Sequence, residues 1–195
     1  MCAVVKSRLN VGPRKFPIIL FFVIISQPKI VQNEKGIKVM SMECKSLDLK
    51  FSRVAQCKLK ALRPDVTEVT MEAILLQKSK PLDNITIWAT VRRRGVQVGK
   101  PLLEFRVDLC AFMRNTRRNL LAELAYKILG FEKWSNINHT CPYKHDLLVN
   151  KYPFDGKRMG RFVPLQEGRY SLVGKWFFYD ILRIILTVHF QVYEK

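Results

Sequence analysis

Histidine and cysteine are the residue types of this chain that could do chemistry. The 195 residues include three histidines, His139, His145 and His189. His139 and His145 are six positions apart around a proline, which is not the spacing of two metal ligands on one helix or strand. The cysteines lack CxxC spacing, and the motifs GxSxG, HExxH, GxGxxG and the P-loop do not occur. We therefore expect no catalytic residues, no metal and no cofactor, and a protein that is not an enzyme.

The cysteines fit a disulfide framework better than a reactive site. Cys2 lies in the N-terminal segment, which leaves Cys44, Cys57, Cys110 and Cys141. Four cysteines allow three pairings. The sequential pairing, Cys44 with Cys57 and Cys110 with Cys141, closes the smallest loops, and we predict it. Each bridge would stabilise the fold by about 3–4 kcal/mol, and such bridges persist only in an oxidising compartment.

The N-terminal segment is typical of a secretory signal peptide. Residues 16–26 are apolar and uncharged, and Arg14 and Lys15 precede them. This run is too short to span a bilayer as a helix, which takes about 20 residues. We assign residues 1–30 to a signal peptide with its n-region and residues 31–195 to a single domain. Cleavage is expected between about Ser26 and Val31. The alternative is a buried strand in a cytosolic protein, but we expect a secreted, extracellular protein with no transmembrane segment after cleavage.

Two sequons support the same compartment. Asn84-Ile85-Thr86 and Asn138-His139-Thr140 match the N-glycosylation acceptor pattern. Both lie beside turn or loop signals, where an acceptor must be exposed. We therefore predict glycosylation at Asn84 and Asn138.

Alternating apolar residues predict a mainly β fold. Runs of period two indicate strands that bury one face. Short strands with turn signals between them are typical of an antiparallel sandwich. The predicted strands cover residues 37–44, 51–59, 66–76, 85–91, 102–109, 146–149, 169–179 and 182–193. Residues 152–163 contain Pro153, Gly156 and Gly160 and are predicted to form a long loop.

One helix is predicted between strands, over residues 116–129. Asn115 or Thr116 could cap its start and Gly130 its end. Its apolar stripe is formed by Leu120, Leu121, Leu124 and Ile128. This stripe must cover something, because a helix of this length is marginal alone. It either packs against a closed sheet or gates a ligand entrance. In the second case, the ligand-binding residues are predicted to be Leu124, Ile128, Trp176 and Phe178.

The chain is strongly basic, with a formal net charge of +18. Residues 31–195 hold 29 basic and 16 acidic residues, which leaves +13 after the predicted cleavage. A secreted domain rarely meets nucleic acid, so we expect no nucleic-acid partner. The charge serves solubility, or it favours an anionic membrane surface or an acidic headgroup.

Four segments resemble a known family. They are VDLCAFM (107–113), NINHTCPYKHDLLV (136–149), FVPLQEGRYSL (162–172) and WFFYDILRIILTVHF (176–190). They look like an insect-specific family of small secreted proteins of unassigned function. Relatives of that family include the CheB chemosensory proteins, which are similar to the ganglioside activator and to ML-type lipid-recognition domains. The resemblance covers roughly residues 40–194. It implies an antiparallel β-sandwich or β-cup whose sheets separate to admit a lipid-like ligand.

Two functions follow as expectations. The first is a secreted binding protein for a hydrophobic or lipid-like small molecule, such as a pheromone or cuticular lipid in a chemosensory response. The second is an extracellular interaction protein that modulates a membrane receptor or channel without carrying a ligand. Its contacts would be the arginines Arg92, Arg93, Arg94, Arg114, Arg117 and Arg118. A hydrolase is a third and poorer hypothesis.

Overall fold

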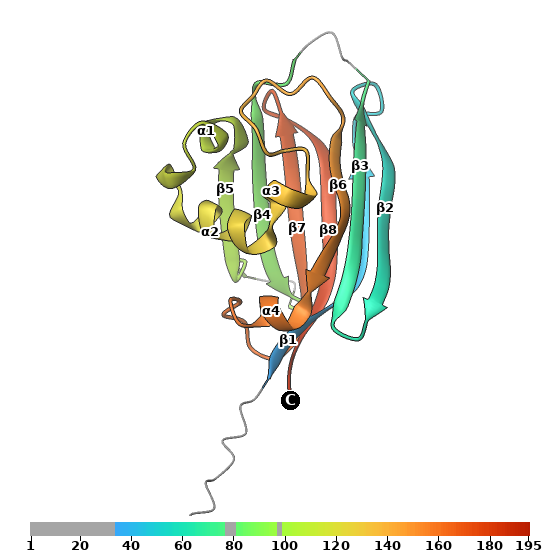
Figure 1. Cartoon of the computed structure of the whole chain (residues 1–195), viewed down its shortest axis with the longest axis vertical. Helices are drawn as coiled ribbons and strands as arrows, with labels where there is room; N and C mark the ends of the chain where they lie inside the picture. The colour runs from blue at the N-terminus through green and yellow to red at the C-terminus, as the bar shows by residue number, and fades with distance from the viewer. Residues whose placement is uncertain (1–33, 77–80, 97–98) are drawn as a thin grey trace, which may run out of the picture. The chain divides into compact units, whose positions relative to one another are not determined.

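The computed structural model describes residues 34–76, 81–96 and 99–195. The predicted signal peptide and its cleavage region lie outside these residues. The described chain folds into two antiparallel sheets and a set of short helices (Figure 1).

The larger sheet has five strands in the order β1-β8-β7-β4-β5. They are β1 (Lys35–Ser46), β8 (Ile181–Glu194), β7 (Gly168–Phe178), β4 (Ile85–Arg93) and β5 (Leu103–Asp108). β4 and β5 form the predicted hairpin, and β7 and β8 form a second one through Tyr179 and Asp180, both at positive φ. As predicted, the inward face of β7 carries Tyr170, Leu172, Gly174, Trp176 and Phe178.

The smaller sheet has the order β2-β3-β6, with β2 (Ser52–Arg63), β3 (Val66–Leu75) and β6 (Leu147–Asp155). β2 does not keep the uniform alternation that the sequence predicted. Its register with β3 shifts between Val54 and Gln56, so the inward positions change from even to odd numbers. Uniform alternation from Phe51 would have placed Arg53 on the inward face, but Arg53 is exposed.

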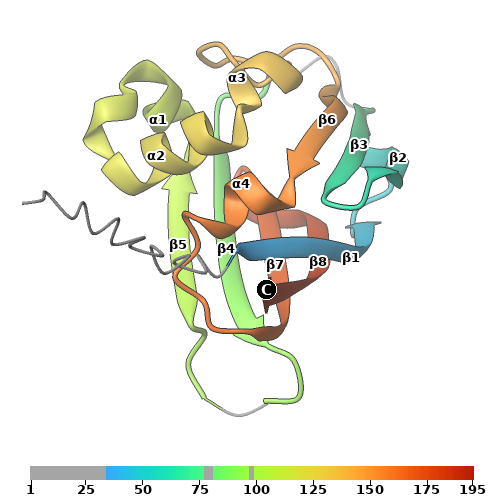
Figure 2. The ribbon, with the colours of Figure 1, turned by 60° about the horizontal axis from the view of Figure 1, so that its bottom comes forward.

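The two sheets are joined along one side. β1 and β2 are edge strands of different sheets, and a short turn connects them. Asp48 in this turn pairs with Arg183 of β8, whose guanidinium lies 3.9 Å from the centroid of the Phe51 ring. The Cys44–Cys57 disulfide also links β1 to β2. The opposite edges, β5 and β6, have no such direct connection, and the helices lie between them (Figures 1 and 2).

The prediction of one helix over 116–129 is wrong in detail. The connection from β5 to β6 contains α1 (Leu109–Arg114), the 3-10 turn η1 (Thr116–Arg118), α2 (Leu120–Leu129) and α3 (Phe131–Trp134). Asp108 caps α1 by accepting a bond from the Ala111 amide, and Asn119, not Asn115 or Thr116, caps α2 through the Ala122 amide. Gly130 ends α2 at φ 63° as predicted, where a residue without Cβ is unstrained.

The predicted loop over 152–163 is also wrong. β6 continues to Asp155, and α4 (Gly156–Gly160) follows directly. Pro153 is tolerated because β6 is an edge strand, and at this position it pairs with β3 on one side. Gly156 and Gly160 lie so close to the backbone of β1 that a Cβ at either position would overlap it. These glycines therefore allow close packing and do not mark a loop.

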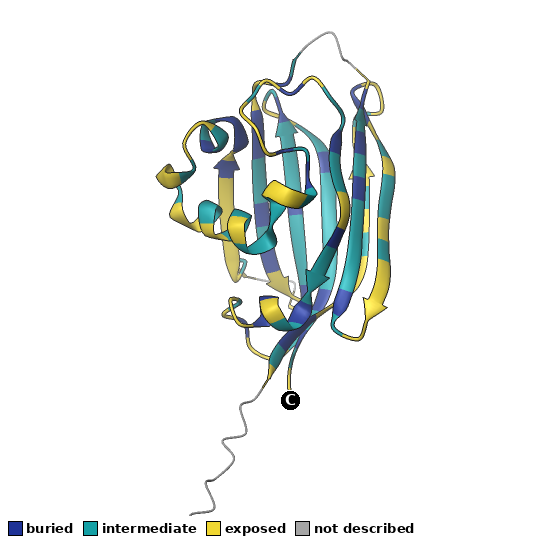
Figure 3. Ribbon diagram, in the orientation of Figure 1, coloured by how far each residue is buried: buried dark blue, intermediate teal, exposed yellow. Residues whose placement is uncertain are grey.

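Two separate clusters of buried apolar side chains make up the core. One gathers around Phe51, Ile85, Phe178 and Ile184, and the other around Tyr170, Phe190 and Val192 near α4. Figure 3 shows the buried positions along the facing strands. The predicted fold class, a mainly antiparallel β-sandwich with two disulfides, is confirmed.

Candidate ligand-binding site

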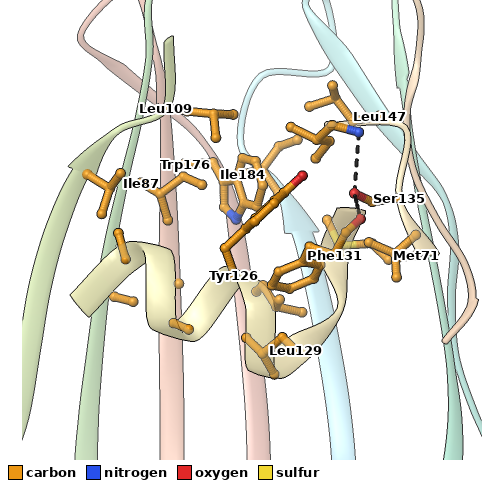
Figure 4. Close-up of a pocket in the computed structure, with 18 of the residues that line it drawn as sticks. Met71, Ile87, Leu109, Tyr126, Leu129, Phe131, Ser135, Leu147, Trp176 and Ile184 are labelled. Atoms are coloured by element: carbon orange, nitrogen blue, oxygen red, sulfur yellow. Dashed lines mark hydrogen bonds between the residues drawn. The ribbon is translucent and has the colours of Figure 1, made fainter. Parts of the chain in front are cut away.

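A cavity of about 240 Å³ lies between the two sheets and under the helices (Figure 4). Both sheets and the β5–β6 connection contribute to its wall. The larger sheet supplies Ile87, Ala89, Phe105, Val107, Leu172, Gly174, Trp176, Ile184 and Leu186. The smaller sheet supplies Met71, Ala73, Leu147, Leu148 and Val149. The helices and the residues after them supply Leu109, Phe112, Ala122, Ala125, Tyr126, Leu129, Phe131, Ser135 and Ile137.

The cavity exists because small residues occupy inward positions where larger ones would close it. Ala73, Ala89 and Gly174 lie on facing strands, and Ala122 and Ala125 lie on the helix above them. A protein interior normally has few voids larger than a water molecule. At about 24 cal/mol per Å³, an empty apolar cavity of this size would destabilise the fold by about 6 kcal/mol. That is a large part of the net stability of an ordinary domain.

Polar atoms in the cavity wall are few. The Ser135 hydroxyl is satisfied, because it donates to the Phe131 carbonyl at 2.7 Å and accepts from the Ile137 amide at 3.3 Å. The Tyr126 hydroxyl is buried and has no hydrogen-bond partner among the described residues. Burial raises the pKa of this phenol, so it is a neutral donor at physiological pH. None of the described residues that line the cavity is charged.

α2 presents a different face to the cavity from the one predicted. Ala122, Ala125, Tyr126 and Leu129 point inward, at the spacing i, i+3, i+4 and i+7. Leu120, Leu121 and Leu124, which were predicted to be covered, are instead 74%, 76% and 54% exposed. The sequence carried both stripes. The predicted stripe has more leucines, but the stripe that faces the cavity has the same helical spacing.

The four predicted ligand-binding residues do not come together. Trp176 lines the cavity. Phe178 lies on the same face of β7 but is fully buried, with its ring centroid 5.3 Å from that of Phe51. Ile128 packs against the second core cluster, and Leu124 faces outward. Sequence reasoning missed Tyr126 and the small residues, which are the features that define the site.

Both disulfides have the predicted pairing. Cys110, at the start of α1, is bonded to Cys141 in the segment before β6, so this bridge fastens the helical connection at its two ends. The sequon residues Asn84 and Asn138 are both exposed. Asn138 donates to the Glu132 carbonyl at 3.1 Å.

The histidines lie outside the cavity wall. His139 and His145 approach each other, with 2.9 Å between their Nε2 atoms, and the Tyr143 hydroxyl donates to the His139 carbonyl at 2.6 Å. His189 hydrogen bonds to Ser171 within the β7–β8 hairpin at 2.7 Å. The described part of the chain contains no group of three or more His, Cys, Asp or Glu side chains arranged to hold a metal. Within the same part, no helix has the length and apolarity to cross a membrane.

The arginines expected to form one contact surface are separated. Arg92, Arg93 and Arg94 lie where β4 enters the hairpin to β5, whereas Arg114, Arg117 and Arg118 follow the far end of β5. β5 is six residues long, which is about 20 Å at the strand rise of 3.3 Å per residue. Arg92 also donates to the Gly99 carbonyl at 2.7 Å. The six arginines therefore form two groups.

Part of the chain matches a known sequence family, and its fold is similar to a solved structure. Residues 85–172 match the sequence model of a family described as a protein of unknown function (DUF1091). No curated protein matches the chain. Among solved structures, the chain is similar to chicken MD-1 in a crystal structure of its complex with lipid IVa, with 12% sequence identity and a TM-score of 0.33. This similarity covers 83% of this chain and 97% of that chain. The segment matched by the family model runs from β4 into β7 and includes the whole helical connection above the cavity.

Proposed function

We propose that this chain is a binding protein for a hydrophobic or lipid-like small molecule, which it holds between its two sheets. The observation that carries the proposal is the uncharged, almost wholly apolar cavity of about 240 Å³ between the sheets. An apolar ligand placed there would gain about 25 cal/mol for each Å² of apolar surface removed from water. It would also remove the free-energy penalty of the empty space.

The alternative is that the apolar side chains simply pack together as a core. The two separate clusters of buried residues argue against it. Inward residues towards the ends of β7 and β8, such as Tyr170, Phe178 and Phe190, are buried. In the middle of the same strands, Leu172, Trp176 and Leu186 point inward but stay only partly buried. Apolar side chains of that size would be buried if the opposite sheet packed directly on them.

Gly174 provides the sharpest test, because a side chain there would enter the cavity. A Cβ at Gly174 would make only ordinary contacts, 3.8 Å from Trp176 and 3.9 Å from Leu186. We expect Gly174→Leu to abolish uptake of a neutral naphthylamine fluorophore. Its melting temperature should be unchanged or higher, since burying a leucine side chain in existing space contributes about 1.5–3 kcal/mol. The matched control is Gly174→Ala, which adds little volume and should keep uptake.

Native mass spectrometry of the purified wild-type protein supplies the complementary measurement. Co-purified lipid in the wild type and its loss in Gly174→Leu would support the proposal. A wild-type protein that is always empty and takes up no fluorophore would refute it, as would full uptake by a folded Gly174→Leu variant.

We further propose that the protein is secreted and glycosylated at Asn84 and Asn138. The two disulfides and the exposure of both sequon asparagines support this compartment. Expression in cultured eukaryotic cells should release a product whose mass falls after enzymatic removal of N-glycans. Retention of an unglycosylated chain inside the cells would contradict it.

The chemosensory role remains part of this proposal and determines the first ligands to test. The sequence resemblance to chemosensory relatives directs attention to cuticular lipids and long-chain pheromones. A membrane receptor or channel would be the protein that responds to the loaded carrier.

A further inference from the structure

The cavity wall includes a buried polar atom that has no hydrogen-bond partner among the described residues. Tyr126 extends from α2 into the cavity (Figure 4), and its hydroxyl has no hydrogen-bond partner among the described residues. Leaving a buried hydroxyl without a partner destabilises a fold by about 1–3 kcal/mol. Phenylalanine at this position would give the same packing without that penalty. The presence of a tyrosine at this position is therefore explained if a bound ligand accepts the hydrogen bond of its hydroxyl.

We propose that the ligand carries a neutral oxygen acceptor, such as the carbonyl of an ester, aldehyde or ketone, and that Tyr126 donates a hydrogen bond to it. This inference rests on the proposed function and adds the chemical class of the ligand. Phenol is a donor to such a group, and the remaining wall suits a hydrocarbon chain.

The same wall disfavours an ionised carboxylate. None of the described lining residues is charged, and Ser135 already uses its hydroxyl for a bond to Phe131. An ion moved into an apolar site without a counter-charge is strongly destabilised. A fatty acid at neutral pH should therefore bind less tightly than its own methyl ester.

Isothermal titration with three matched ligands tests this inference. The ligands are a saturated fatty-acid methyl ester, the free acid and the alkane of equal chain length. Wild-type protein should bind the ester about 3- to 10-fold more tightly than the alkane, the range expected for one net hydrogen bond. Tyr126→Phe should remove that difference and leave alkane affinity unchanged. The matched control, Tyr170→Phe, deletes a phenol oxygen that bonds to the Gln166 carbonyl outside the cavity, and it should keep the preference.

The outcomes separate this inference from the proposed function. If wild-type protein binds ester, acid and alkane equally, or if Tyr126→Phe keeps the ester preference, the role of Tyr126 is refuted while hydrophobic binding stands. If Tyr126→Phe weakens ester and alkane by the same factor, the residue contributes packing only, and the inference fails. Binding of none of the three ligands would refute the proposed function itself.

A second, independent observation concerns the outer face of the helical connection. Leu120, Leu121 and Leu124 project into solvent from α2, the helix whose other face lines the cavity. Arg114, Arg117 and Arg118 lie just before them and are also exposed. Figure 3 shows exposed residues along this segment. Residues 109–129 hold four basic side chains and one carboxylate, Glu123, which is paired with Lys127 at 2.7 Å.

We infer that this surface docks on an anionic lipid bilayer. The leucines would enter the boundary between headgroups and acyl chains, and the arginines would contact the anionic headgroups. Exposed leucines alone would suit any apolar partner. The three adjoining arginines are exposed and have no ion pair among the described residues, so the surface suits a partner that is both apolar and negatively charged. This placement would bring α2, whose other face lines the cavity, to the membrane from which a lipid could enter.

Vesicle co-sedimentation tests the docking surface without a cavity ligand. Wild-type protein should bind vesicles of phosphatidylcholine with phosphatidylserine and should not bind pure phosphatidylcholine. Arg117→Gln with Arg118→Gln should weaken binding about fivefold for each charge removed. Leu120→Gln with Leu121→Gln should abolish it. The matched controls are Lys58→Gln with Lys60→Gln and Leu49→Gln, which are exposed positions on and before β2.

The controls make the result decisive. Equal losses in the arginine and lysine pairs would show general electrostatic attraction, and the proposed surface would be refuted. The proposal would also be overturned if the variant with Leu120→Gln and Leu121→Gln bound vesicles as tightly as the wild type, or if the wild-type protein bound no vesicles. All of these side chains are exposed, so the variants should keep the melting temperature of the wild type.

Discussion

At the scale of single residues, the cavity is a consequence of side-chain volume at inward positions. Ala73, Ala89 and Gly174 sit where the strand alternation directs a side chain between the sheets. Phe178 lies on the same face of β7, four residues after Gly174. Its ring fills the space between the sheets at that point and is fully buried. One strand face thus contributes both a packed core and an open space, and the difference lies only in residue size.

Leu124 and Phe178 should differ sharply in their effects on stability. Leu124 is 54% exposed, so Leu124→Ala should change the free energy of unfolding by less than about 0.5 kcal/mol. Phe178→Ala removes a buried ring from a packed cluster and should cost about 3–5 kcal/mol. Urea unfolding measures both. A loss above 2 kcal/mol for Leu124→Ala, on the scale of a buried leucine, would show that this face of α2 is covered.

At the scale of elements, the two sheets are held together differently at their two sides. The β1–β2 side is closed by a short turn and the Cys44–Cys57 bridge. The β5–β6 side is closed by short helices that contain few buried residues. These helices are fastened by the Cys110–Cys141 bridge and by a strand-like pairing of Ser135 with Val149. We therefore expect a ligand to enter through the helical side.

Removing the two disulfides should have similar effects on stability but different effects on ligand release. By chain entropy, the Cys110–Cys141 bridge contributes about 4 kcal/mol and the Cys44–Cys57 bridge about 3 kcal/mol. Cys110→Ser with Cys141→Ser should speed fluorophore dissociation, because it frees the start of α1. Cys44→Ser with Cys57→Ser should leave the dissociation rate close to that of the wild type. Stopped-flow measurements give both rates, and equal acceleration in the two variants would show that neither side is the entrance.

At the scale of the whole molecule, two tyrosines connect parts of the chain that are distant in sequence, one through its hydroxyl and one through its backbone. The Tyr193 hydroxyl on β8 donates to Asp65, between β2 and β3, at 2.6 Å. This bond raises the pKa of Tyr193 to about 12. Tyr143 is fully buried, and its backbone forms two hydrogen bonds with Leu82. Burial raises the pKa of Tyr143 to about 12.

Stability should therefore fall in alkali. A phenol whose pKa is raised above its ordinary value of 10.0 contributes fully below pH 10. That contribution is lost as the pH rises from 10 through about 12, because the unfolded chain releases the proton first. Urea midpoints measured across this range should drop for the wild type and drop less steeply for Tyr143→Phe and Tyr193→Phe. Parallel pH profiles for all three proteins would contradict this explanation.

The sequence by itself determined the local features of this protein. Period-two patterns predicted the inward faces of β3, β4, β7 and β8, because side chains alternate in any strand. The smallest-loop rule predicted both disulfides. These predictions hold because they depend on neighbours a few residues apart or on chain connectivity.

Only the tertiary structure decided which of those apolar faces meet and which stay apart. The bulge in β2 reverses the alternation after Val54, and Gly156 packs tightly against β1 in a helix where the sequence predicted a loop. α2 carries two stripes with helical spacing, and the choice between them depends on which one faces the sheets. The cavity depends on the distance between the sheets, which is set by the summed volumes of side chains far apart in the chain. No local pattern records that distance, so the site and its unpaired Tyr126 hydroxyl emerge only once both sheets are in place.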